Sequence, residues 1–111
     1  MTNIFSLKAE ELVSKIKDSQ LTSVELCERY IERVEKFEKD VKAWAHFDKK
    51  LLLEKAAEAD EYRRSGKPTG PLHGIPVAVK DIVGTVDMPT ECGTVIRKGK
   101  SYSQNAEIID L

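Results

Sequence analysis

Three successive apolar stripes at helical spacing most constrain the fold of this chain. Each stripe places apolar residues at the i, i+3, i+4, i+7 positions of one helix face, and such a face must cover other apolar surface. We therefore predict a helical region over residues 1–66, followed by a region of different character over residues 67–111. The stripes consist of Ala9, Leu12, Val13 and Ile16; of Cys27, Tyr30, Ile31 and Val34; and of Leu52, Ala56, Ala59 and Tyr62.

Capping signals set the ends of these helices. Thr22 and Glu25 have the spacing of a capping box, in which each side chain accepts a hydrogen bond from the other residue's backbone N–H. Ser6 is the expected N-cap of the first helix, and Asp48 that of the third. Gly66 is expected to end the third helix.

The region after residue 66 contains one short β-branched run. Residues 75–79 (IPVAV) predict a strand buried on both faces, although Pro76 cannot donate a ladder hydrogen bond. A loop rich in Gly, Pro and Thr follows over about residues 84–100. Residues 106–111 look like the opening of a helix capped by Ser103 or Asn105, and the apolar pattern is still running at the last residue. We therefore predict an α/β fold in which residues 1–111 form an incomplete single domain.

Composition excludes several classes of function. Apolar residues make up 41% of the chain, charged residues 33%, and the net charge is −1, so neither nucleic-acid nor membrane binding is expected. The two cysteines and two histidines lack metal-ligand spacing, and we predict no metal site and no organic cofactor. Cys27 is expected in the core, and Cys92 as a reduced loop thiol of a cytoplasmic protein.

Lys80 is the residue with the most chemical interest. It directly follows the predicted strand, where desolvation can favour a neutral amine that acts as base or nucleophile. A solvated or salt-bridged lysine explains the same pattern, and the residues alone leave the choice open. We expect the neighbouring Asp81 to cap backbone N–H groups, since an adjacent anion would favour the charged lysine.

Three segments in the same order resemble the amidase-signature family: residues 21–26 (LTSVEL), 70–81 (GPLHGIPVAVKD) and 88–94 (MPTECGT). The resemblance implies a mixed β-sheet flanked by helices. It also implies hydrolysis of carboxylic amides, or transfer of their ammonia, through a Ser-cisSer-Lys triad whose lysine is Lys80. In that mechanism a neutral lysine takes a proton from the bridging serine, which in turn deprotonates the nucleophilic serine.

The chain departs from the family because both triad serines are expected beyond residue 111. Ser101 and Ser103 lack flanking glycines and are not assigned to the triad. We therefore expect an N-terminal amidase fragment that is inactive alone, with unknown substrate-binding residues. The parent enzyme would act on a small amide and could form a homodimer or join amidotransferase subunits. The alternatives are a non-catalytic short paralogue that binds or regulates a partner, and an independent enzyme that forms a Schiff base on lysine.

Overall fold

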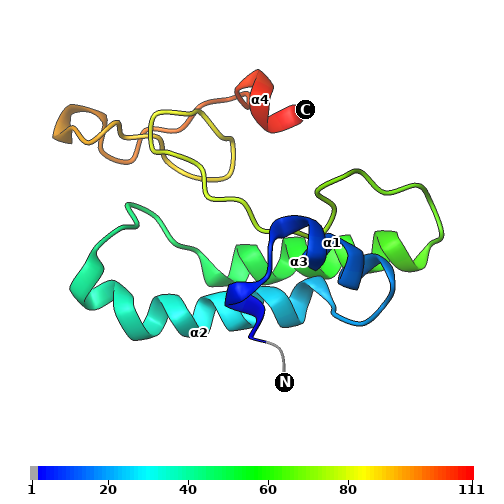
Figure 1. Cartoon of the computed structure of the whole chain (residues 1–111). Helices are drawn as coiled ribbons and strands as arrows, with labels where there is room; N and C mark the ends of the chain where they lie inside the picture. Colours follow the sequence, from blue (N-terminus) through cyan, green and yellow to red (C-terminus); the bar gives the residue numbers. More distant parts are fainter. Residues whose placement is uncertain (1–2) are drawn as a thin grey trace. The chain divides into compact units, whose positions relative to one another are not determined.

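The computed structural model describes residues 3–111, and these divide into two compact units (Figure 1). The helical unit contains the described residues up to Ala43 together with Asp48–Pro76. The loop unit contains Trp44–Phe47 together with Val77–Leu111. The prediction that residues 1–111 are part of one domain stays a prediction.

The helical unit contains the three predicted helices: α1 (Ala9–Lys17), α2 (Ser23–Val41) and α3 (Lys49–Arg64). A short 3-10 helix, η1 (Ile4–Ser6), precedes them. Figure 1 shows α2 and α3 side by side, and these two helices pack against each other.

Two of the three N-caps predicted for the helical unit are confirmed. The Thr22 hydroxyl accepts from the Glu25 N–H at 3.0 Å, and the Glu25 carboxylate accepts from the Thr22 N–H at 2.8 Å. Asp48 accepts from the Leu51 N–H at 3.0 Å. The prediction for Ser6 is wrong, because this residue belongs to η1.

The predicted apolar stripes form the core of the helical unit. Leu12, Ile16 and Leu26 are at most 3% exposed and pack together. Burying each of these side chains contributes roughly 1.5–3 kcal/mol. Cys27 is buried as predicted, at 1% exposure. Partly buried side chains complete the cluster, namely Ile4, Leu7, Leu21, Tyr30 and Ile75.

The predicted strand over residues 75–79 is wrong for this structure. None of the described residues lies in a strand, and residues 75–79 have no regular secondary structure. A strand needs a neighbour to satisfy its backbone N–H and C=O groups, and the described chain offers no second strand. The helical part of the predicted fold class is therefore present, and no sheet forms among residues 3–111.

The loop unit contains only short helical turns, η2 (Val95–Arg97) and α4 (Glu107–Asp110). The predicted cap for the last helix is wrong, because Ala106 occupies the N-cap position and no side chain caps it. The Asn105 side chain instead accepts from the Val86 N–H at 2.9 Å and donates to Asp110 at 2.9 Å.

Across the described residues, no helix is both long enough and apolar enough to cross a membrane.

Candidate functional site

The segment preceding Lys80 is fixed to the helical unit by a glycine turn. The turn closes with the His73 N–H donating to the Gly70 carbonyl at 3.2 Å and the Ile75 N–H donating to the Leu72 carbonyl at 3.1 Å. Gly74 has a φ of +80°, which side chains rarely adopt. These contacts define where the chain leaves the helical unit at Pro76.

Gly74 also has close neighbours on the side where a side chain would point. A Cβ placed there would lie 3.3 Å from Ile16 side-chain atoms and 3.4 Å from the Ser23 Cβ. The Ser23 hydroxyl donates to the Gly74 carbonyl at 2.7 Å. The backbone conformation therefore favours glycine at this position, and the close neighbours leave little room for a Cβ.

His73 has a structural role in this turn. Its Nε2 lies 2.7 Å from the Ala59 carbonyl oxygen in α3. A carbonyl can only accept, so Nε2 must carry the proton in this contact. The imidazole therefore joins the turn to α3, and this contact indicates a structural role instead of proton transfer.

Asp60 is a buried carboxylate that sequence reasoning missed. It is 3% exposed, and it accepts from the Ser23 N–H at 2.8 Å and the Val24 N–H at 3.1 Å. These are the first two N–H groups of α2, which have no partner inside the helix. Asp60 therefore completes the cap that Thr22 begins, and its negative charge faces the positive end of the α2 dipole.

Cys27 lies in the same buried region. Burial raises the pKa of its thiol, and the nearby Asp60 charge raises that pKa further, while a hydrogen bond with Ser23 opposes both effects. The thiolate is the reactive form of cysteine, so these conditions keep Cys27 protonated and unreactive.

Lys80, the single predicted catalytic residue, lies in the loop unit and is exposed. Its carbonyl accepts from the Val83 N–H at 3.0 Å in a turn. Within the described chain its ammonium group has no hydrogen bond or ion pair. Its assignment to a proton relay therefore stays a prediction.

Asp81 caps backbone groups, as expected from the sequence. Its Oδ1 accepts from the Glu91 N–H at 2.9 Å, and its carbonyl accepts from the Cys92 N–H at 2.9 Å. These bonds hold residues 91–92 beside the lysine-bearing turn. Cys92 is exposed, in agreement with its prediction as a loop thiol.

A second group of polar side chains surrounds Asp81. His46 Nε2 lies 3.0 Å from Glu91 Oε1, and the ligand atoms of His46, Asp81 and Glu91 all lie within 4.8 Å of one another. We call these three residues the His46 cluster. Little in the amino-acid pattern points to it, because His46 is separated from the other two along the chain.

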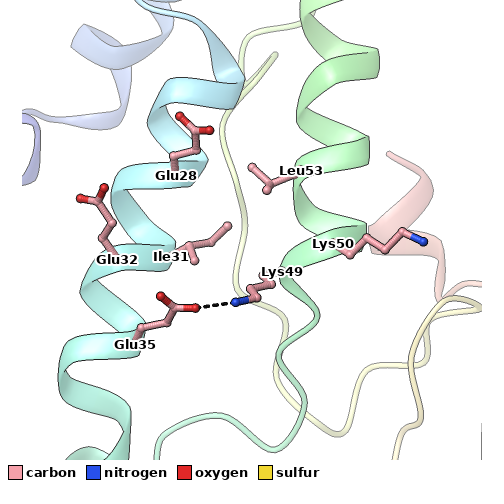
Figure 2. Close-up of a pocket in the computed structure, with 7 residues that line it drawn as sticks. All are labelled: Glu28, Ile31, Glu32, Glu35, Lys49, Lys50 and Leu53. Atoms are coloured by element: carbon pink, nitrogen blue, oxygen red, sulfur yellow. Dashed lines mark hydrogen bonds and ion pairs between the residues drawn. The ribbon is translucent and has the colours of Figure 1, made fainter.

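A groove between α2 and α3 is lined only by residues of the helical unit (Figure 2). It carries one ion pair, between Lys49 and Glu35 at 2.7 Å. None of residues 70–81 lines it, so it is not part of the segment that carries Lys80. Its lining consists of Glu28, Ile31, Glu32, Glu35, Lys49, Lys50 and Leu53.

Comparison with known proteins adds independent findings. A family model described as Amidase matches residues 25–111. The chain is 38% identical over 99 residues to a glutamyl-tRNA(Gln) amidotransferase subunit of Streptomyces coelicolor, covering 89% of this chain and 20% of that protein. The protein of the same name from Chloroflexus aurantiacus is 34% identical over 110 residues, covering 99% of this chain and 23% of the relative.

A third relative with that name, from Renibacterium salmoninarum, is 32% identical over 110 residues, which is 99% of this chain and 21% of the relative. The chain thus spans about a fifth of the length of these curated relatives. The matched region includes Lys80 and the glycine turn that precedes it.

Proposed function

The chain belongs to the amidase family, and on this basis we propose that it is the N-terminal portion of an amidase-signature enzyme. The parent enzyme cleaves carboxylic amide C–N bonds through a Ser-cisSer-Lys triad, and this chain supplies only Lys80. The observation that carries the proposal is the match over residues 25–111, which runs through the lysine segment.

Lys80 would serve as the base of a proton relay. Its neutral amine takes a proton from the bridging serine, which takes the proton of the nucleophilic serine. The nucleophilic oxygen bonds to the amide carbon, the amine leaves with a proton, and water then releases the acid. Both serines belong to polypeptide beyond residue 111, so we expect the chain alone to be inactive.

The relatives suggest partners for the parent protein. They are named as subunits of a glutamyl-tRNA(Gln) amidotransferase, which supports assembly with amidotransferase subunits in place of, or in addition to, a homodimer. The substrate would be a small amide, and the location cytoplasmic. Whether ammonia is released or transferred depends on the parts of the protein that bind the acceptor.

A non-catalytic binding module is the second candidate. Apolar side chains of the loop unit are strongly exposed, with Val95 at 87%, Ile96 at 79% and Ile108 at 71%. Exposed apolar side chains of this kind favour contact with another polypeptide. Both candidates allow such contact, and they differ in whether Lys80 takes part in chemistry.

The first test uses the chain alone. We expect no turnover of small aliphatic or aromatic amides above the buffer rate. Turnover that Lys80→Ala abolishes would contradict the proposal, because it would show a complete active site within these 111 residues.

The second test supplies the missing serines. The matched region of the Streptomyces coelicolor relative is replaced by residues of this chain, and amide hydrolysis is measured. We expect activity that Lys80→Ala lowers by at least about a thousandfold, as for loss of a triad member. Lys98→Ala, an exposed lysine of the same unit, is the matched control.

Two outcomes of the chimera experiment are informative. Full activity of the Lys80→Ala chimera would remove Lys80 from the triad. A folded but inactive chimera would favour the non-catalytic candidate.

A further inference from the structure

The His46 cluster combines one imidazole with two carboxylates at short range. His46, Asp81 and Glu91 each offer one ligand atom, and all three atoms lie within 4.8 Å of one another. His46 comes from Trp44–Phe47, whereas the two acids come from Val77–Leu111, and both segments belong to the loop unit. The fold therefore brings together groups that sequence spacing does not reveal.

Backbone hydrogen bonds hold both carboxylates in place. Asp81 Oδ1 accepts from the Glu91 N–H at 2.9 Å, and Glu91 Oε2 accepts from the Gly99 N–H. Each carboxylate thus has one oxygen engaged by the backbone, and its other oxygen can bind a ligand. Such anchoring of the outer oxygen is a common feature of carboxylate metal ligands.

The His46 nitrogen faces the Glu91 carboxylate without a hydrogen bond. Its Nε2 is shielded from solvent, and no hydrogen bond with acceptable geometry satisfies it. Glu91 Oε1 lies 3.0 Å away, close enough for an ion pair but outside hydrogen-bond geometry. A cation between the two atoms would give both the nitrogen and the carboxylate oxygen a partner with suitable geometry.

We propose that the His46 cluster binds one divalent zinc ion through His46 Nε2 and one oxygen each of Asp81 and Glu91. Zinc accepts imidazole nitrogen and carboxylate oxygen at about 2.0–2.2 Å, which places two ligand atoms of a tetrahedral site about 3.4 Å apart. The 3.0 Å contact of His46 with Glu91 is close to this spacing. A small side-chain rotation draws in the most distant ligand atom, and water takes the fourth position.

A metal crosslink would add stability to the loop unit. Every fully buried apolar residue of the described chain lies in the helical unit, whereas the buried residues of the loop unit are Thr85 and Thr90. Small units without a core commonly depend on a metal or a disulfide. The zinc ion would join Trp44–Phe47 to the turn at Asp81 and the loop at Glu91.

The test uses the whole 111-residue chain after removal of metal with a chelator. Zinc binding is followed by calorimetric titration, and cobalt(II) is used as a spectroscopic substitute. We expect one saturable site and a higher melting temperature with zinc. His46→Ala should weaken binding at least about tenfold and remove the thermal shift. Glu91→Gln preserves the shape of the side chain and should have the same effect, so it replaces His46→Ala as the test if the histidine variant fails to fold.

Two control variants distinguish this site from zinc binding elsewhere in the loop unit. Glu107→Gln removes an exposed carboxylate of the same unit and should leave zinc affinity unchanged. Cys92→Ser removes the exposed thiol next to Glu91 and should also leave it unchanged. Loss of binding in Cys92→Ser with retention in His46→Ala would overturn the proposal.

Absence of saturable binding would overturn it too, and would identify His46 and Glu91 as an ion pair only. The readouts do not involve amide hydrolysis, so the zinc proposal and the amidase proposal can fail independently.

Discussion

Removing the buried carboxylate of Asp60 should destabilise the helical unit more than any surface change on α3. Asp60 is 3% exposed, and its two oxygens accept from the Ser23 and Val24 N–H groups at 2.8 and 3.1 Å. Asp60→Ala leaves both N–H groups without an acceptor in a region that water reaches poorly. It also removes a negative charge from the N-terminus of α2.

The expected magnitude follows from these two losses. An orphaned buried donor costs about 1–3 kcal/mol, so we expect Asp60→Ala to lower the free energy of unfolding by about 3 kcal/mol. Asp60→Asn keeps one oxygen as acceptor but turns an amide group toward the other donor, and its expected cost is about 2 kcal/mol. Glu61→Ala, at an exposed neighbouring position, should change stability by less than about 0.5 kcal/mol.

Urea unfolding followed by far-UV circular dichroism measures all three variants. The free energies come from linear extrapolation, with equal slopes showing that the native state keeps its compactness. Equal stability of Asp60→Asn and wild type would contradict this account of the cap, since it would show that neither the charge nor the second acceptor contributes. A Glu61→Ala cost equal to that of Asp60→Ala would contradict it as well.

Three further predictions test other features of the helical unit. Gly74→Ala should lower the free energy of unfolding by about 1–3 kcal/mol, because it places a Cβ at φ +80° against Ile16. Gly70→Ala is the control: its Cβ meets open space, and the free energy should change by less than about 1 kcal/mol. Thermal unfolding measures both variants. Burial raises the pKa of the Cys27 thiol above its unfolded value near 9.0. Its contribution to stability is therefore complete below that pH and is lost as the pH rises above it. In urea unfolding at several pH values, Cys27→Ala should show a smaller loss of stability at alkaline pH. Leu26→Ala should lower the free energy of urea unfolding by about 2–5 kcal/mol, because Leu26 is fully buried, and a cost under about 1 kcal/mol would contradict the assigned core.

Sequence patterns located the three long helices because their determinants are local. The Thr22 and Glu25 capping box joins residues three positions apart, and the apolar stripes repeat within a few turns. The Ser6 cap failed for an equally local reason: η1 takes up that residue, and α1 begins after Lys8. The Lys8 N–H then donates to the Glu11 carboxylate at 2.7 Å, which supplies half of a capping box.

The strand prediction failed because a strand is not a local structure. Residues 75–79 have the apolar, β-branched composition of a buried strand, but a ladder needs a second strand. The 99 matched residues make up only 20% of the Streptomyces coelicolor relative, so most of that protein's length has no counterpart here. A sheet involving residues 75–79 therefore stays a prediction for the proposed parent enzyme.

Residue patterns alone located the three long helices, their apolar stripes and the caps at Thr22 and Asp48. They also indicated the amidase family, through the segment that contains Lys80. Folding in three dimensions was needed to place Asp60 at the start of α2, 37 positions from Ser23, and to bring His46 to Glu91. The two groups of features differ in how far apart along the chain the contacting residues lie. Helix hydrogen bonds and caps join close neighbours, whereas a buried carboxylate or a metal site depends on which distant segments the fold brings into contact.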